Sequence, residues 1–386
     1  MSIASFVVTA ALAAMALPKG SVIEVSNVEQ LYDAVNEPAN AGATIVLAPG
    51  RYVLTKVKAG VGTRPNNGRL ELQTDMSIFG VTGHPEDVII DSSDPVNGPS
   101  FALGGGNGGT IRIGRGRNSV EWLTVIGGSN SAAGVQTDLV GAPAVLRVAH
   151  VVSRGSVRGI DVRNLGPAGA GRTIVIDLND DEVFENTAMN GQGIRFVNSS
   201  ADGASIAATL HNNRSHDNNQ GFLASNERSS HASITIDSHD DRFEDDMIGG
   251  VIFGGLMTAA GTASGNTVTF TMHAGSIAGS HGSVPPQNLT AGLNVIGGAF
   301  TPPAGIANAA SSNAVRVSIW GTKFDDNAAL DIEAWGAKSL TADLAGTGDV
   351  VTVDLHGVSA HARSLAHDSV PDEAAGTSRS TIDTRP

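Results

Sequence analysis

The strongest constraint on the fold is a segment that occurs three times between residues 173 and 246. The copies start at Thr173, Ser205 and Ser233, so they lie 32 and then 28 residues apart. Each copy opens with alternating apolar residues (TIVIDLN, SIAATLH and SITIDSH) and is followed by a glycine and a second short apolar run. Repetition at this spacing is typical of a solenoid, in which each coil buries its apolar face only against its neighbours. We therefore predict a stack of coils built from strands.

The composition agrees with strands joined by many turns. The 386 residues include 48 glycines and few aromatic residues (4%), and the repeats are rich in β-branched residues, which favour strands over helices. Weaker copies begin near residues 144, 267, 314 and 350. We predict one β-helix domain over residues 20–363, interrupted by a Gly/Pro-rich insertion at about 279–312. The polar segment 364–386 lacks the pattern and is predicted to be disordered.

The net charge and the first apolar run restrict the partners and the location. A net charge of −14 argues against a nucleic-acid partner, whose phosphates need a basic surface. Residues 1–18 have the length of a signal peptide, and Ala14 and Ala16 offer a cleavage site. We therefore expect a secreted or periplasmic monomer. The basic residues that usually precede such a run are missing, so a buried N-terminal segment is the alternative. No apolar run is long enough to span a bilayer.

Residues 22–53 carry a resemblance to a known family. They combine a short strand, a helix that contains LYDAV, and the strand-and-turn segment TIVLAPGRY. This order resembles the opening of right-handed parallel β-helix proteins of the pectin-lyase-like superfamily. The resemblance implies an all-β, right-handed parallel β-helix whose short N-terminal helix covers the end of the coil. The cap also has a physical reason, because an open solenoid end exposes core residues and unpaired strand edges.

Aligning the coils places polar residues in rows along the solenoid. Histidines His150, His211, His239, His273 and His356 fall in one row with Asn179 and Trp320. Such a row can bind metal or transfer protons, or it can be a stack of flat side chains about 4.8 Å apart. Trp320 favours stacking, because an indole does not ligate metals. A second row follows Phe184, Phe243 and Phe324, which alternation predicts to point inward, and is predicted to be an amide ladder at a turn. Its members are Asn186, Asn218, Asp245 and Asp326.

Acidic clusters near the same turns suggest a cation site. Asp180 and Asp181 lie two coils from Asp240 and Asp241, and carboxylate oxygens are the ligands that calcium prefers. Calcium is therefore the one cofactor that we consider. The simpler interpretation is an acidic edge exposed to solvent.

The strand after each glycine is where the resemblance implies that chemistry takes place. Alternation predicts that Asp161, Arg163 and Arg195 point outward from neighbouring coils, within reach of one another. An arginine can neutralise a uronate carboxylate while a nearby base removes the adjacent proton. We predict these three as catalytic residues. The predicted substrate-binding residues are Gln136, Asp138, Asn198, Glu227 and Arg228. The alternative is a structural ion pair.

The sequence also departs from the family. It has no paired-aspartate turn followed by GHG, and neither a WxDH nor an RxPxxR segment, the motifs of the galacturonan hydrolases and the pectate and pectin lyases. We predict an exported carbohydrate-active protein with lyase-type chemistry on an acidic polysaccharide. The alternatives are a non-catalytic β-helix serving in adhesion or as a scaffold, and a metal-binding solenoid that uses the histidine row.

Overall fold

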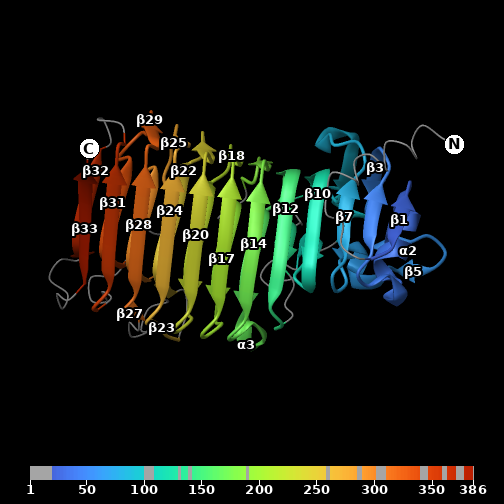
Figure 1. Ribbon diagram of the computed structural model, residues 1–386, viewed down its shortest axis with the longest axis horizontal. Coiled ribbons are helices and arrows are strands. Elements are labelled where there is room, and N and C mark those ends of the chain that lie inside the picture. The colour runs from blue at the N-terminus through green and yellow to red at the C-terminus, as the bar shows by residue number, and fades with distance from the viewer. Residues whose placement is uncertain are drawn as a thin grey trace.

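The chain forms a right-handed parallel β-helix (Figure 1), as the resemblance implies. The computed structural model describes residues 20–99, 108–128, 132–137, 141–187, 191–257, 261–284, 289–300, 310–339, 347–358, 363–370 and 378–385. A regular coil has a long strand, a short strand and a third strand. The long and short strands join one sheet, here called the first sheet, and the third strand joins the second sheet. The predicted signal peptide, residues 1–18, lies outside the described residues.

The strands of the first sheet repeat with the coils. Its long strands are β7 (Ser77–Gly80), β10 (Gly116–Ile126), β12 (Ala144–Arg154), β14 (Thr173–Asn179), β17 (Ser205–His211), β20 (Ser233–His239), β24 (Thr267–His273), β28 (Ala314–Trp320), β31 (Val350–His356) and β33 (Arg379–Arg385). Its short strands are β8 (Val88–Asp91), β15 (Glu182–Phe184), β18 (Arg214–His216), β21 (Arg242–Glu244), β25 (Ser276–Ala278) and β29 (Lys323–Asp325). β10 and β12 run through both positions without a break.

The second sheet receives one strand from each coil. In spatial order the strands are β6 (Leu70–Glu71), β9 (Gly109–Ile113), β11 (Ala133–Thr137), β13 (Arg158–Leu165), β16 (Gln192–Ser199), β19 (Gln220–Glu227), β22 (Ile248–Met257), β26 (Leu293–Phe300), β30 (Ile332–Ser339) and β32 (Ser364–Val370). The minor elements are the hairpin β4 (Val57–Lys58) and β5 (Gly62–Thr63), the pair β23 (Ala263–Ser264) and β27 (Ala310–Ser311), the short helix α3 (Gly166–Gly169), and the 3-10 turns Pro38–Asn40, Pro65–Gly68 and Pro85–Asp87.

One continuous apolar core fills the space between the two sheets. On β14 the inward residues are Ile174, Ile176 and Leu178, and the alternating pattern places their equivalents on every later coil. The second sheet contributes inward residues such as Ile160 and Phe196. Each coil therefore buries large aliphatic side chains, worth about 1.5–3 kcal/mol apiece relative to exposure, only because its neighbours cover them.

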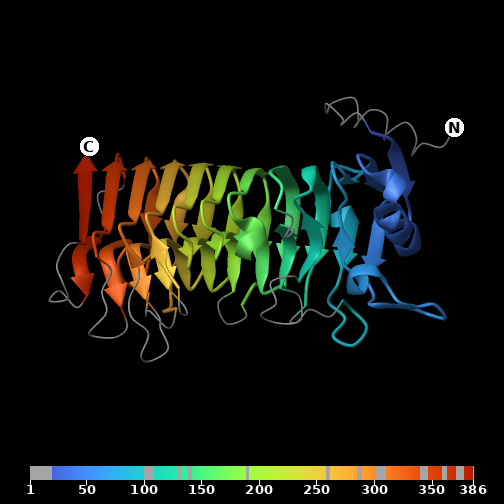
Figure 2. The same ribbon diagram turned by 90° about the horizontal axis from the view of Figure 1, so that it is seen from below.

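A helix covers the N-terminal end of this core, as predicted (Figure 2). β1 (Val22–Val25) and α2 (Val28–Asn36) lie at this end, and β1 pairs in register with β2 (Thr44–Leu47) of the next layer, which is followed by β3 (Gly50–Val53). Asn27 caps α2, because its side-chain oxygen accepts a hydrogen bond from the backbone N–H of Gln30 at 3.0 Å. Leu31 and Tyr32 are buried toward the core, and the Tyr32 hydroxyl donates to the carbonyl of Gly68 at 2.7 Å.

The histidine row forms a stack of rings, the arrangement that one of the two interpretations predicts. Backbone register aligns Asn179, His211, His239, His273, Trp320 and His356. Ring centroids are 5.0 Å apart for His211 and His239, and 3.6 Å apart for Trp320 and His356. His150 does not belong to this row. It lies one residue beyond the partner of Asn179, has a positive φ of 54°, and stacks on Trp122 instead.

The amide ladder exists, but the predicted row is one residue off in two coils. Its members are Asn186, Asn218, Asp246, Ser280 and Asn327, each accepting from the backbone of the preceding coil. Asp245 and Asp326 precede the ladder positions and take left-handed turn conformations, with φ of 56° and 52°. Phe184 is likewise not inward: Val183 fills the core, and the Phe184 ring stacks outside on His216.

Two predicted domain features are corrected by the strands. Within the expected insertion at 279–312, residues 293–300 form the regular strand β26. The tail expected to be disordered contains β32, which pairs with β30, and β33, which pairs with β31. Hydrogen bonding of its backbone to the preceding coil orders this segment in spite of its polarity. Among the described helices, none is long and apolar enough to cross a bilayer.

Candidate functional site

The predicted catalytic residues lie together on the outer face of the second sheet. Gln136 on β11, Asp161 on β13 and Arg195 on β16 occupy one register position in three successive coils. Arg163 lies two residues after Asp161 and points to the same side, because Ile160 and Val162 point into the core. Although these side chains face outward, Asp161 is fully buried and Arg163 and Arg195 are nearly so.

Asp161 is the centre of a cluster of charges, here called the arginine cluster (Arg158, Asp161, Arg163, Arg195 and Glu227). Its carboxylate lies 3.6 Å from the Arg163 guanidinium and 3.6 Å from that of Arg195. Gln136 donates a hydrogen bond to it at 2.8 Å. Arg195 also donates to Glu227 at 3.2 Å. Three arginines thus face two carboxylates, which leaves the cluster one positive charge in excess.

The protonation behaviour follows from this arrangement. Burial favours the neutral form of Asp161, but the guanidinium groups of Arg163, Arg195 and Arg158 outweigh burial and lower its pKa to about 2. Burial also disfavours the charged form of Arg195, yet Asp161 and Glu227 raise its pKa above the usual value. The pKa of Arg163 is lowered by burial, and that of Arg158 falls to about 10 by burial and the nearby Arg195. The arginines therefore differ in how readily each gives up a proton.

The cluster does not satisfy its own polar atoms. Four buried atoms, Nε and Nη2 of Arg163, Nε of Arg195 and Oδ1 of Asp161, have no hydrogen-bond partner. Leaving a buried donor unpaired costs about 1–3 kcal/mol, and more for a charged group. Such atoms are expected where a ligand or water completes the site. Three unpaired donors and an excess positive charge point to an anion.

On the same face of the second sheet, the side chains change from charged to mainly apolar one coil further on. The positions after Arg195 in its row are Leu223 and Val251, and those after Arg163 are Val197, Ser225, Phe253 and Ile296. Apart from Ser225, these side chains are apolar and form a second buried cluster outside the β-helix, together with Val284, Leu289 and Trp335. Val284 and Leu289 pair through backbone hydrogen bonds. The arginine cluster therefore begins where an apolar covering of the sheet ends.

The remaining predicted binding residues have different fates. Glu227 belongs to the arginine cluster, and Gln136 donates a hydrogen bond to Asp161 of that cluster. Asn198 does not, because it is fully buried in an amide ladder in which Asn164 donates to Asn198 and Asn198 donates to Asn226, each at 2.8 Å. Arg228 follows the end of β19 in a left-handed conformation with φ of 49°. Asp138 lies outside the described residues.

Sequence reasoning missed Arg158 and its partner. Arg158 donates to Gln192 at 3.0 Å and influences the pKa of Asp161. Alternation along β13 places position 158 on the opposite face from Asp161, so the strand pattern carried no signal for Arg158.

The four predicted calcium ligands lie in two different environments. Asp181 and Asp241 are buried members of the turn ladder that includes Asn213. Burial raises the pKa of Asp181 well above its usual value, and that of Asp241 to about 6. A carboxyl group that prefers its proton is a poor ligand for a hard cation. Asp180 and Asp240 lie at exposed turns, where Asn212 donates to Asp180 at 2.6 Å.

Among the described residues, the one group with metal-ligand geometry is Asp237, His239 and His273.

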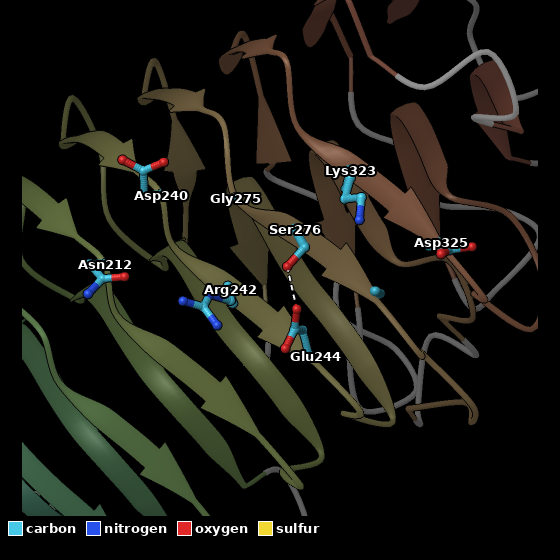
Figure 3. A pocket seen from close by; sticks show the side chains of 9 residues that line it. Asn212, Asp240, Arg242, Glu244, Gly275, Ser276, Lys323 and Asp325 are labelled. Carbon is cyan, nitrogen blue, oxygen red and sulfur yellow. Dashed lines mark hydrogen bonds between the residues drawn. The ribbon is translucent and has the colours of Figure 1, made fainter.

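A groove lies on a different surface, over the short strands of the first sheet (Figure 3). Arg242 and Lys323 line it together with Asp240, Glu244 and Asp325. Ser276 Oγ donates to Glu244 at 2.5 Å inside the groove. The lining has no buried atom without a partner, and its charges nearly cancel. The groove is therefore an open polar surface, and the chemistry of unpaired buried charge belongs to the arginine cluster.

Comparison with known proteins yields similarity of fold. No family model matches the sequence, and no curated protein sequence is significantly similar to it. Among solved structures, the A-module of the mannuronan C-5 epimerase AlgE6 from Azotobacter vinelandii superposes with a TM-score of 0.43 at 12% identity, covering 94% of this chain and 100% of that one. The AlgE4 A-module from the same organism gives 0.42 at 12% identity, over 93% and 100%. DFA-IIIase from Arthrobacter chlorophenolicus A6 gives 0.40 at 13%, over 86% and 79%. Similarity this distant does not bear on the reaction.

Proposed function

We propose that this protein is a carbohydrate-active enzyme that binds an acidic polysaccharide at the arginine cluster and cleaves it by β-elimination. The observation that carries the proposal is that three buried guanidinium nitrogens, Nε and Nη2 of Arg163 and Nε of Arg195, have no hydrogen-bond partner. A uronate carboxylate matches them in charge and geometry, because guanidinium binds carboxylate through paired hydrogen bonds.

The two arginines take different roles. Arg195 keeps its charge, since Asp161 and Glu227 raise its pKa, and it neutralises the substrate carboxylate. Arg163, whose pKa is lowered by burial, is the candidate base. In its neutral form it accepts the proton from the carbon next to the carboxylate. The electron pair of that C–H bond forms a carbon–carbon double bond, the bond from the neighbouring carbon to the glycosidic oxygen breaks, and the departing oxygen takes a proton from water.

The test is a panel of uronate polysaccharides, assayed for the ultraviolet absorbance of an unsaturated product with and without calcium. We expect product from at least one of them. Arg195→Ala should lower kcat/KM by about 100-fold or more, because it removes the charge that stabilises the developing anion. Arg147→Ala is the matched control. Arg147 pairs with Asp177 on the first sheet, away from the cluster. If no polymer yields unsaturated product, the lyase reaction is wrong.

A second candidate, a non-catalytic adhesion or scaffold protein, is favoured by the burial of the cluster. The side chains of Asp161, Arg163 and Arg195 are 0%, 6% and 9% exposed. A purely structural cluster predicts that Arg195→Ala costs up to about 3–5 kcal/mol, because it removes one of the two guanidinium groups that pair with buried Asp161 and leaves Glu227 without its arginine. It also predicts that no polysaccharide raises Tm. A ligand-dependent rise in Tm of the wild-type chain that is lost in Arg195→Ala contradicts the structural role.

Export is part of the proposal, because an enzyme of this kind meets its polymer outside the cytoplasm. We propose that residues 1–18 direct secretion or transfer to the periplasm. Expression of the full chain, cell fractionation and N-terminal sequencing of the mature product test this. Recovery of the intact N-terminus in the cytoplasm alone would contradict it.

A further inference from the structure

A second site is built into the ring stack of the first sheet, on a face that the arginine cluster does not use. Asp237 and His239 lie two residues apart on β20, so both side chains point outward. His273 on β24 is the register partner of His239 in the next coil. One ligand atom from each of the three residues lies within 4.8 Å of the other two. We propose that Asp237, His239 and His273 bind a divalent first-row transition-metal ion such as Zn²⁺.

The kind of donor selects the kind of ion. Two imidazole nitrogens and one carboxylate oxygen suit Zn²⁺ and its neighbours, whereas Ca²⁺ and Mg²⁺ prefer oxygen alone. His239 Nε2 already lies 3.1 Å from Asp237 Oδ1. Adjacent ligands of a tetrahedral zinc with bonds of about 2.1 Å lie about 3.4 Å apart. The carboxylate and one imidazole therefore sit near the required separation. A small shift of the partly buried His273 ring within the stack brings in the third ligand atom, which already lies within 4.8 Å of the other two.

The neighbouring coils hold the rings in place. His239 is sandwiched between His211 and His273, with centroid distances of 5.0 and 4.9 Å and nearly parallel planes. Beyond His273 the stack continues with Trp320. Stacking on both sides limits the orientations of both imidazoles, so less conformational entropy is lost when the ion binds.

This coil differs from the others in its carboxylate. In the same outward row, Asp177 forms an ion pair with Arg147 and Asp354 forms one with Arg385. The partner of Asp237 is His239, and its register neighbours Thr209 and Thr271 are uncharged. The Asp237 carboxylate is half exposed and is not neutralised by an arginine, so it can contribute negative charge to a cation.

The experiment uses the full chain without an affinity tag, treated with EDTA and dialysed, and titrates it with Zn²⁺ by calorimetry. We expect one tight site per chain. His239→Ala and His273→Asn should each weaken binding by at least 10-fold, and Asp237→Asn by several-fold. The asparagine at position 273 keeps a flat amide in the row, as Asn179 does naturally, so the fold is preserved. His211→Asn is the matched control, because it removes a stacked ring but no ligand, and it should change the affinity less than 3-fold.

Cobalt gives a second readout. Co²⁺ bound by the wild-type chain and by His211→Asn should show the visible absorption of a tetrahedral site, and His273→Asn should not. The proposal is overturned if Zn²⁺ binds wild type no more tightly than His273→Asn, if His211→Asn loses as much affinity as His273→Asn, or if Ca²⁺ competes equally for the site. Each of these outcomes would leave the row as a structural stack only.

Discussion

Asp241 shows how a single buried carboxyl can set the pH dependence of stability. Its Oδ1 accepts from the backbone and side chain of Asn213, and its Oδ2 is 2.5 Å from the Ser238 hydroxyl. Burial raises its pKa from 3.8 to about 6. The folded state therefore holds the proton more tightly than the unfolded state. The resulting stabilisation is complete below about pH 4 and is lost as the pH rises through about 6.

Asp241→Asn should remove this loss. The amide keeps an acceptor toward Asn213 and supplies a donor toward Ser238 without carrying a charge. At pH 8 we expect the variant to be more stable than wild type by on the order of 2 kcal/mol, and the difference to vanish near pH 4. Urea denaturation at both pH values measures it. Asp240→Asn, at the exposed neighbouring position, is the control, and an equal gain in that variant would contradict the explanation.

The roles of the two arginines make a prediction about the pH profile of activity. If Arg163 is the base, activity rises toward alkaline pH as its guanidinium loses a proton. Arg163→Lys places a group of lower intrinsic pKa at the same position. We expect it to retain part of the activity, with the rising limb moved to lower pH. The measurement is kcat/KM against pH. A profile that keeps its midpoint while its height falls would assign Arg163 a positioning role only.

At the scale of elements, the helix α2 closes the coil stack. Leu31 is fully buried beneath it, while Asp33 on the same helix is exposed. Leu31→Ala should cost about 2–5 kcal/mol, because it leaves a cavity between the helix and the first coil. Asp33→Ala should change stability by less than about 0.5 kcal/mol. Chemical denaturation of both variants compares them, and equal effects would mean that the cap is not packed as described.

Predictions of strands and of aligned residues from the sequence were accurate where two repeating patterns agreed. Alternation along a strand and repetition between coils together fixed the inward residues of β14, the ring stack from Asn179 to His356, and the pairing of Asp161 with Arg195. Prediction failed where one residue in a turn took a left-handed conformation. Asp245, Asp326 and His150 are each displaced by one position for this reason, since no residue type marks such a turn uniquely.

The burial of the site could not be read from the sequence. Alternation assigned Asp161, Arg163 and Asn198 to a solvent-facing strand, but all three side chains are buried, and apolar side chains cover the neighbouring part of the same sheet face. Covering depends on how segments far apart in the chain fold over that face, and a strand pattern contains no information about them. The burial of Asp181 and Asp241, two of the predicted calcium ligands, could not be read from the sequence for the same reason.

At the scale of the whole molecule, the polar end segment belongs to the stack. Ile382 on β33 packs against the core, and β33 pairs along its length with β31. Truncation after residue 363 should therefore destabilise the last coils by roughly 2 kcal/mol or more, through exposure of buried apolar surface. Hydrogen exchange of the β31 amides should increase in the truncated chain, while that of β14 is unchanged. Unaltered exchange in β31 would support the disordered tail that the sequence predicted.

Because contacts are limited to neighbouring coils, the number of coils can change without altering a distant site. Each coil contacts only the coils on either side of it, so the surroundings of Asp161 are set by the strands from β11 to β19. Inserting one complete coil between β24 and β28 would lengthen the body by about 4.8 Å and leave those surroundings unchanged. In the proposed enzyme, the length of polysaccharide that could lie along the stack is thus adjustable independently of the site where a bond would be broken.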